Sequence, residues 1–453
     1  MQNNINMATM PLGRHHVWVV FVASLGQLIG TGVATLAGII IPLLNIISHP
    51  ELSSAMQGII GAMDLIGISI GSVFFGKLID RYGYILFFRI CPAIVLAFAL
   101  VSILFPSIPV LIVCLFFIGF GIGGEYCLDS NYISELMPVK WKSLMIGVAK
   151  TASAFGNIIV AAICFLILKD WKTGYEWSHL MWIIAVISFF MLFCRIWFYQ
   201  SPKWLLEHGH TLAAEEAAKK FLGKDVIIEP SSNSLTPVSN EVKNKVNTNF
   251  FISNWKKVIL TGIPWACEGL GVYGIGVFLP VLIMSLGIEH SSSGELAVAH
   301  VDSSVLITFF ISCIILPGFL LGLWLIIKKC NLCKMQSWGF ILCAASLIIL
   351  LIASLGNWPK WISIVAFMAF ELFLNMGPHL ITFILPPKVY PVATRGFGSG
   401  IAASLGKIGA VLGVFFIPVI LHSGGIIWVL GVSAFVMLLG AVITAIFHKS
   451  VSS

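Results

Sequence analysis

The stretch Gly119–Lys150 reads GFGIGGEYCLDSNYISELMPVKWKSLMIGVAK, and it is the part of the sequence that indicates the fold most directly. It begins as an apolar run that contains Glu125 and Asp129, leaves that run through a short charged segment, and re-enters apolar sequence carrying Lys150. Ionisable side chains inside a membrane are costly and are retained mostly where they function. The stretch therefore predicts membrane-spanning helices with functional charges between them.

The same layout returns 253 residues later, as counted from Gly124 to Gly377. Further positions repeat at that offset: Pro138 and Pro391, Lys142 and Arg395, Gly147 and Gly400, Gly156 and Gly409. Internal repeats of this kind are typical of secondary transporters, which are built from two related halves. The sequence therefore points to a transporter rather than an enzyme.

Composition places the chain in a membrane. Of 453 residues, 58% are hydrophobic and only 10% are charged, with a mean hydropathy of +1.00, whereas soluble domains carry about 25% charged residues. No alternating segments of barrel type occur, so helices are expected to satisfy the backbone in lipid. The net charge of +7 lies in short loops, which argues against a nucleic-acid partner.

A helical span needs about 20 apolar residues. On that basis we predict an all-α membrane protein with twelve transmembrane helices in two pseudo-symmetric six-helix bundles. The predicted spans lie near 17–47, 56–78, 85–105, 108–134, 143–168, 178–199, 257–287, 301–328, 334–355, 361–386, 396–421 and 424–447.

The distribution of basic residues predicts the orientation. With both termini in the cytoplasm, twenty of the 26 Lys and Arg residues lie in cytoplasmic segments, three lie outside and three lie within spans. Cytoplasmic loops of membrane proteins carry such an excess of basic residues. We therefore expect both termini on the cytoplasmic side.

The chain divides into three predicted parts: an N-terminal bundle over 1–199, a cytoplasmic linker over 200–256 and a C-terminal bundle over 257–453. Within the linker, Thr211 to Leu222 has the charge pattern of a short amphipathic helix. Residues 229–249 are polar and rich in Ser, Asn and Pro, as in a flexible segment. Cys330 and Cys333 form a CxxC pair without a second ligand pair, so we expect no metal site and no cofactor.

Charged loops at the cytoplasmic ends of the spans form a candidate conformational latch. Small residues let two helices approach closely, and paired charges could join the two halves on one side and release them on the other. The alternative is ordinary topological charge at span ends. The predicted latch residues are Gly76, Asp80, Arg81, Glu135, Lys142 and Arg395.

These loops carry a specific resemblance. GKLIDRYG at 76–83, YISELMPVKWKS at 132–143 and SPKWLLEHGH at 201–210 resemble loop signatures of the major facilitator superfamily, in the branch of sugar porters, phosphate:proton symporters and metabolite:proton symporters. The second-half copy of the first signature departs from the pattern, because Ile327 and Lys328 stand where Asp-Arg is usual.

Two further blocks, GGEYCLDSNYISE at 123–135 and residues 375–413 with Lys407, are similar to the phosphate:proton symporter pattern. The chain departs from that pattern in the first span, which has no acid. The seventh-span aspartate of the pattern falls at Gly269, with Glu268 one place earlier. The glutamines of hexose porters are also absent. The resemblance implies the fold and leaves the substrate open.

Glu125 lies ten residues before the loop residue Glu135, and Lys150 lies eight residues after the loop residue Lys142. Since each helical residue advances about 1.5 Å, we predict that Glu125 and Lys150 lie at similar depth in the membrane on consecutive spans. A buried carboxylate can exchange a proton when access switches between the two sides of a membrane. We therefore predict a proton-coupling role for Glu125 and Asp129, with Lys150 as a modulator. A structural ion pair is the alternative.

Arg195, four residues before its predicted span end at 199, is expected to extend its head group to the membrane surface. Other charged and aromatic residues near the predicted cavity are candidates for substrate contact. The predicted substrate-binding residues are Glu268, Glu371, Lys407, Tyr126, Trp265, Tyr273 and His379.

The sequence thus predicts proton-coupled symport of a small polar metabolite, a zwitterion or organic ion, by alternating access. Acids outnumber bases within the spans by five to three, which favours a zwitterion or cation. One alternative is an organic-anion or phosphate-like symporter, and another is a non-transporting receptor or sensor. A monomer in a bacterial inner membrane is expected, with the lipid bilayer, protons and a small molecule as partners.

Overall fold

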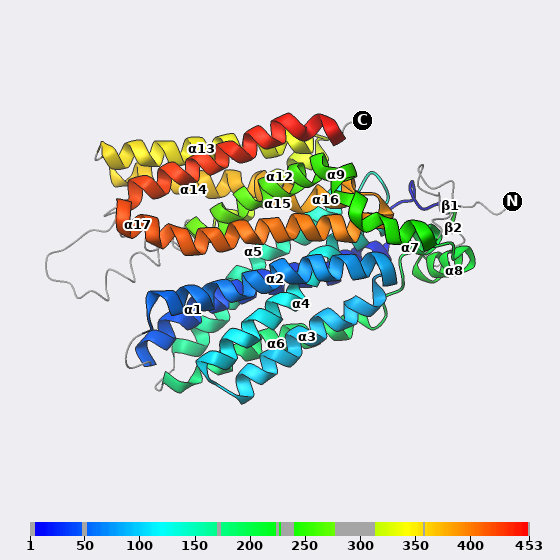
Figure 1. Cartoon of the computed structure of the whole chain (residues 1–453), viewed down its shortest axis with the longest axis horizontal. Coiled ribbons are helices and arrows are strands. Elements are labelled where there is room, and N and C mark those ends of the chain that lie inside the picture. Colours follow the sequence, from blue (N-terminus) through cyan, green and yellow to red (C-terminus); the bar gives the residue numbers. More distant parts are fainter. Residues whose placement is uncertain are drawn as a thin grey trace. The chain divides into compact units, whose positions relative to one another are not determined.

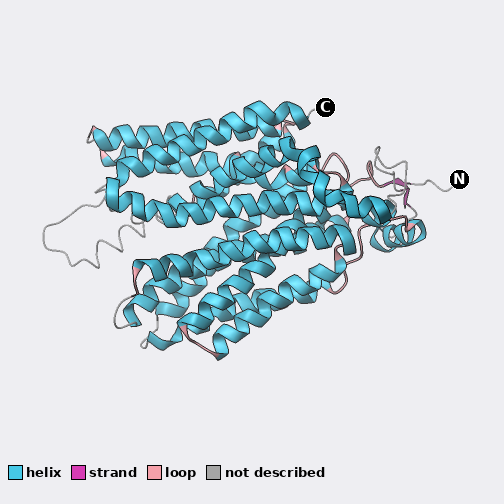
Figure 2. Cartoon of the chain, in the orientation of Figure 1, coloured by secondary structure: helices cyan, strands magenta, loops and turns pink. Residues whose placement is uncertain are grey.

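The structure is a computed structural model, and it describes residues 5–47, 52–169, 174–222, 226–227, 240–276, 313–356 and 358–451. Nearly all of the described chain is helical (Figure 1, Figure 2). A parallel pairing of two very short strands, with Ile5 opposite Val226, is the exception within this part of the chain. The all-α prediction is confirmed apart from that pairing.

The elements follow one another in chain order as β1 (Ile5–Asn6), α1 (Arg14–Ile47), α2 (Ser54–Tyr82), α3 (Ile85–Leu104), α4 (Ile108–Leu136), α5 (Lys142–Lys169), a 3-10 helix (Gly174–Leu180), α6 (Met181–Arg195), α7 (Pro202–Glu207), α8 (Thr211–Leu222) and β2 (Val226–Ile227). The second half comprises α9 (Asn240–Gly269), a π-helical turn (Leu270–Ile275), α12 (Ile315–Ile327), α13 (Leu332–Leu355), α14 (Lys360–Met376), α15 (Pro378–Ile384), α16 (Pro386–Val389), a 3-10 turn (Val392–Thr394), α17 (Arg395–Phe447) and a final 3-10 turn (His448–Val451).

The twelve predicted spans can be matched to these helices. Within the described residues, ten helices are long and apolar enough to cross a membrane. One of them, α17, joins two predicted spans across Gly425, whose φ of 71° is not helical. The shorter apolar helix α12 lies in the predicted span 301–328, of which residues 301–312 are outside the described part. The fold prediction of twelve transmembrane helices is confirmed.

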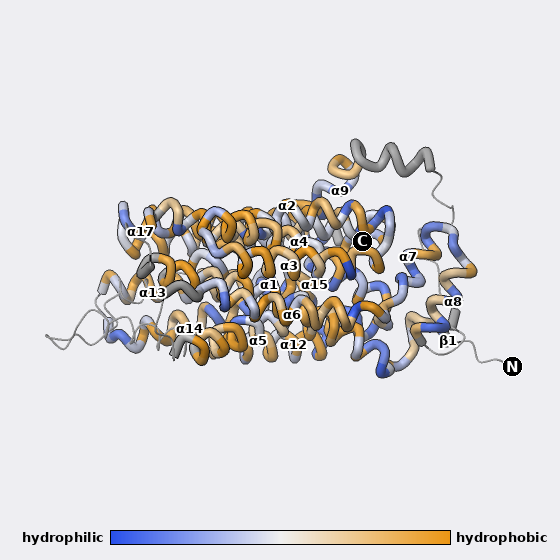
Figure 3. Tube along the Cα trace, turned by 90° about the horizontal axis from the view of Figure 1, so that it is seen from below, coloured by the Kyte–Doolittle hydropathy of each residue, from blue (hydrophilic) through white to orange (hydrophobic). Residues whose placement is uncertain are grey.

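The predicted linker, residues 200–256, contains helices α7 and α8 and the start of α9. Helix α8 covers Thr211–Leu222, the predicted amphipathic segment, and its tube is coloured with many hydrophilic residues in contrast to the bundle helices (Figure 3). Residues 229–239 of the predicted flexible segment lie outside the described residues. From Asn240 onward the chain is already helical in α9, so the flexible prediction was wrong for 240–249.

The chain forms two compact units. Unit 1 comprises Met1–Val258 with Phe383–Ser404, and unit 2 comprises Ile259–Thr382 with Leu405–Ser453. The segment Phe383–Ser404 comes from the second half of the sequence, yet it packs into unit 1. This segment, which includes the start of α17, takes part in the second cluster described below.

Close helix contacts in unit 1 depend on glycine. A Cβ at Gly67 or Gly71 on α2 would overlap backbone atoms of Phe116 or Phe120 on α4, and a Cβ at Gly119 would overlap the backbone of Asp64. Small residues spaced in this way allow two helix backbones to approach, as in membrane helix pairs generally. Gly119 is therefore a position of close contact between α2 and α4.

Unit 2 has an apolar core with large aromatic side chains. Phe340, Phe367 and Phe370 are fully buried, and they pack with Leu347 and Met437. The seventh span continues past Gly269 as the π-helical turn Leu270–Ile275. Such turns are rare and occur frequently at functional sites, and this one carries Tyr273.

The glycine contacts give a stability prediction. Gly119→Ala is expected to destabilise the protein, because overpacking a tight helix contact typically costs about 1–3 kcal/mol. The matched control is Gly38→Ala in α1, where no atom lies within 4 Å of the new Cβ. The measurement is the apparent melting temperature of purified protein in detergent, and equal melting temperatures for the two variants would contradict the packing account.

Candidate functional site

A buried charge triad lies in unit 1. The Nη1 and Nη2 atoms of Arg195 lie 2.5 Å from Oε2 of Glu125 and 3.0 Å from Oδ1 of Asp129. All three side chains are completely buried. The side-chain amide of Gln27 donates to Oδ2 of Asp129 at 3.3 Å. Helices α1, α4 and α6 thus each contribute to one polar cluster.

The local sequence explains how the triad forms. Glu125 and Asp129 are four residues apart in α4, so they share one helix face. Arg195 is the last residue of α6, and its guanidinium carbon lies 4.8 Å from the centre of the Phe88 ring. Helix α1 approaches through Gly26, where a Cβ would overlap the Asp129 carboxylate.

The expected role of Arg195 was wrong. Its side chain does not extend to the membrane surface, because the guanidinium is completely buried and binds both carboxylates. The predicted proton-coupling residues Glu125 and Asp129 do lie together. The ammonium of Lys150 lies 5.5 Å from the ring centre of Tyr126 and 5.4 Å from that of Phe383.

The charge balance of the triad limits its chemistry. Two carboxylates share one guanidinium, so the triad carries a net charge of −1 when both are ionised and is neutral with one bound proton. Burying an uncompensated charge is costly. One bound proton would therefore remove the excess negative charge of the triad.

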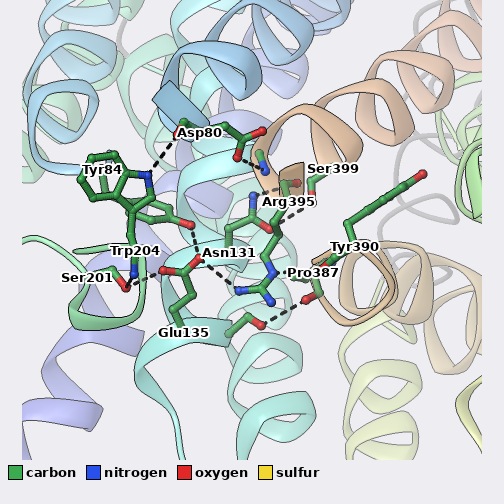
Figure 4. Close-up of polar contacts among 12 residues, drawn as sticks. Asp80, Tyr84, Asn131, Glu135, Ser201, Trp204, Pro387, Tyr390, Arg395 and Ser399 are labelled. Atoms are coloured by element: carbon green, nitrogen blue, oxygen red, sulfur yellow. Dashed lines mark hydrogen bonds and ion pairs between the residues drawn. The ribbon is translucent and has the colours of Figure 1, made fainter. Parts of the chain in front are cut away.

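A second cluster holds the start of α17 within unit 1. The Asp80 carboxylate accepts hydrogen bonds from the backbone amides of Gly396 and Phe397, at 2.7 and 2.8 Å (Figure 4). The first amides of a helix lack partners within the helix and favour a negative charge. Asp80, in the last turn of α2, thus caps α17. Gly83, with a φ of 81°, follows directly after α2 and terminates that helix.

Glu135 is the centre of this cluster (Figure 4). It forms a 3.0 Å ion pair with Arg395 and accepts hydrogen bonds from the hydroxyls of Tyr84, at 2.7 Å, and Ser201. Burial and the nearby negative charge of Glu135 raise the pKa of the Tyr84 phenol well above its usual range. The phenol therefore remains a hydrogen-bond donor at every physiological pH.

Smaller polar groups extend the same contact. Asn131 accepts from the Ser399 hydroxyl at 3.0 Å, and Ser72 donates to the Gly400 carbonyl at 3.1 Å. A Cβ at Gly76 would overlap the Gly396 carbonyl, so this approach of α2 and α17 requires glycine.

The structure brings together four of the six predicted latch residues: Gly76, Asp80, Glu135 and Arg395. Lys142, the first residue of α5, interacts electrostatically with Glu135 and Arg395. Arg81 is exposed, and its guanidinium lies over the Tyr82 ring at 5.1 Å instead. Their role as a latch stays a prediction.

Sequence reasoning missed Tyr84 and Ser201 as partners of Glu135. Ser201 belongs to the SPKW signature and also caps α7, where its hydroxyl accepts from the Trp204 amide at 3.3 Å. The Trp204 indole donates to the Asp80 carbonyl at 3.2 Å. The signature was visible, but nothing in its spacing indicated the partner.

Unit 2 contains the remaining charged candidates. Lys407 on α17 donates to the Tyr273 hydroxyl at 2.6 Å, and its ammonium lies 4.2 Å from the centre of that ring. Nε2 of His379 lies 3.7 Å from Oε1 of Glu268. Glu371 accepts from Asn375.

Two pairs of predicted substrate-binding residues are therefore in contact, Lys407 with Tyr273 and Glu268 with His379. Two further members are placed by their contacts: the Trp265 indole packs where a Cβ of Gly406 would lie, and Tyr126 faces Lys150. The binding role of all seven residues stays a prediction. The excess of acids over bases within the spans no longer favours a zwitterion or cation as the substrate, because Arg195 binds two of the acids, Glu125 and Asp129.

Apolar helices long enough to span a membrane, a sequence built from two related halves and buried ionisable groups within each compact unit define a multi-pass transporter of the major facilitator type. A family model described as "Sugar (and other) transporter" matches residues 18–452. The chain belongs to this family, whose members are transporters rather than enzymes.

Three comparisons show what the chain is similar to. It is 21% identical over 440 residues to the inner membrane metabolite transport protein YgcS of Escherichia coli, covering 97% of this chain and 93% of that protein. It is 25% identical over 414 residues to the inorganic phosphate transporter PHO84 of Saccharomyces cerevisiae, covering 80% and 68% of the two chains. The structure of the proton:xylose symporter XylE, a major facilitator superfamily member, superposes with a TM-score of 0.77 at 18% identity and covers 96% of this chain and 95% of its own.

The triad gives a prediction for stability. Arg195→Gln is expected to destabilise the protein by about 3–5 kcal/mol, because it leaves buried carboxylates without their cation. The matched control is Lys220→Gln, which removes an exposed cation from its ion pair with Glu216 on α8 and should leave the melting temperature unchanged. The measurement is thermal unfolding in detergent. A variant as stable as the wild type would show that Arg195 is not the counter-ion of the triad.

Proposed function

We propose that this transporter couples uptake of a small polar metabolite to proton entry, and that the Arg195–Glu125–Asp129 triad is the proton site. One observation carries the proposal: a single buried guanidinium binds two fully buried carboxylates. A proton added to the triad neutralises it, so the protonated and deprotonated states differ in the charge that the bundle must bury. Such a difference can bias the equilibrium between two conformations.

The cluster around Glu135 supports an alternating mechanism. The ion pair with Arg395 and the capping of α17 by Asp80 join helices of the first repeat to the start of the eleventh span. We propose that these contacts form in one state of the transport cycle and break in the other. Lys150, which lies over rings from both repeats, would modulate the triad from α5.

The substrate is a polar metabolite in this proposal, and a specific observation favours an anion as the second candidate. Lys407 and Tyr273 form a buried donor pair on α17 and the π-helical turn. Such a pair suits a carboxylate or phosphate group, and one relative is named as an inorganic phosphate transporter. The family match favours transport over a receptor or sensor role.

We further propose that the chain acts as a monomer in a bacterial inner membrane with both termini in the cytoplasm. The excess of Lys and Arg in the predicted cytoplasmic segments supports this orientation. The inner membrane protein of Escherichia coli that it resembles supports the location.

Proton coupling is tested with Glu125→Gln. This variant is expected to lose accumulation driven by a pH gradient while retaining counterflow exchange, because the neutral triad no longer needs a proton to cycle. The measurement is uptake in proteoliposomes of a substrate found by a thermal-shift screen against sugars, amino acids, organic acids and inorganic phosphate, since a specific ligand stabilises the folded form. The control is Glu216→Gln on the exposed face of α8, and equal loss of both activities in Glu125→Gln would reject the assignment.

An anionic substrate is tested with Lys407→Ala. Loss of a hydrogen bond from a charged donor, worth about 1.5–3 kcal/mol, should weaken binding about ten- to a hundredfold. Binding of inorganic phosphate and of organic acids is measured calorimetrically, with the exposed Lys256→Ala as the control. Unchanged affinity in Lys407→Ala would reject the anion contact.

A further inference from the structure

A chain of polar side chains runs through unit 2 from Glu371 to Glu268. The Asn375 side-chain amide donates to the carbonyl of Glu371 at 2.8 Å and to its Oε2 at 3.2 Å. Oδ1 of Asn375 lies 3.0 Å from Nδ1 of His379, and Nε2 of His379 lies 3.7 Å from Oε1 of Glu268. All four residues are buried.

The hydrogen bonds of Asn375 fix the tautomer of His379. Nδ2 of an asparagine can only donate and Oδ1 can only accept. Two oxygens of Glu371 lie within hydrogen-bond distance of one end of the Asn375 amide, so that end must be the Nδ2 donor. The Oδ1 end therefore faces the imidazole, and the hydrogen-bond network alone decides this orientation of the amide. Nδ1 of His379 must therefore carry a hydrogen.

The second ring nitrogen then faces a carboxylate. If His379 is neutral with its hydrogen on Nδ1, Nε2 presents a lone pair toward Oε1 of Glu268. Two acceptors facing each other in a buried site repel one another, and a bound proton converts the repulsion into an attraction. Imidazole is more basic than a carboxylate in water, so the proton is expected on Nε2.

We propose that Glu268 and His379 form a second proton-binding site of this chain, with Asn375 and Glu371 fixing the imidazole tautomer. This inference deepens the proposed proton coupling and rests on it for its role in transport. Binding forms an Nε2–H bond with a proton from water and gives an imidazolium–carboxylate pair of zero net charge. Release returns the proton to water and leaves the pair with a charge of −1.

The surroundings of the pair agree with a proton rather than a larger ligand. The Phe319 ring on α12 lies 5.4 Å from the His379 ring, and α13 meets the adjacent Pro378 at Gly339. Glu371 reaches His379 through Asn375 on α14. Lys407 on α17 is a further charged group among the described residues of unit 2. It donates a hydrogen bond to Tyr273, which lies on the π-helical turn that follows Glu268.

The protonation state can be measured without transport. The full-length protein is labelled with ¹⁵N-histidine, placed in lipid nanodiscs and studied by ¹⁵N NMR at pH 7. The His379 signals are identified among the 11 histidines by their loss in His379→Asn. We expect both ring nitrogens protonated in the wild type and Nδ1 alone protonated in Glu268→Gln, while the exposed control Glu216→Gln matches the wild type.

A neutral His379 with its hydrogen on Nε2, or identical His379 signals in the wild type and Glu268→Gln, would overturn the proposal. If Glu268→Gln does not fold, a pH series on the wild type decides instead. On raising the pH the proton must leave Nε2 while Nδ1 keeps its hydrogen, and loss from Nδ1 first would overturn the proposal. The NMR experiment uses no substrate and no pH gradient, so a negative result would reject the Glu268–His379 site without affecting the proposed role of the triad. A negative result in the Glu125→Gln uptake experiment would in turn not change the measured protonation state of His379.

Discussion

The charge arrangement of unit 1 depends on one guanidinium. Arg195 binds Glu125 and Asp129 in a region where none of the three side chains reaches solvent. An unpaired carboxylate at such a place would be strongly unfavourable, so the position of α6 against α4 and the charge of the bundle are linked. Gly26 on α1 and Phe88 on α3 complete the enclosure. Four helices of unit 1 therefore converge on one ionic contact.

A second set of contacts holds the beginning of α17 within unit 1 and involves no proton site. Asp80 and Glu135 bind the beginning of α17, and Phe383–Ser404 belongs to unit 1 although it comes from the second half of the sequence. In a transporter that alternates, contacts of this kind must be strong enough to define a state and few enough to be broken. Hydrogen bonds to helix amides and one ion pair with a buried glutamate meet both requirements.

Much of the fold could be predicted because its signals are local. The length of the apolar segments predicted the spans. The partners of the buried charges could not be predicted in the same way. Arg195 was visible in the sequence, but its partner depends on where α6 ends and how it is rotated. Tyr84 and Ser201 are ordinary polar residues whose hydroxyls meet Glu135 only after three separate segments have packed.

The charge state of the triad is the central claim, and infrared spectroscopy of the purified protein measures it most directly. If the triad holds one proton at pH 7, the spectrum contains a protonated carboxyl band that disappears in both Glu125→Gln and Asp129→Asn, because each variant leaves one carboxylate for one guanidinium. Glu371→Gln, which alters a carboxyl group outside the triad, should retain the band. A wild-type spectrum whose protonated carboxyl bands are unchanged in both triad variants would contradict the account.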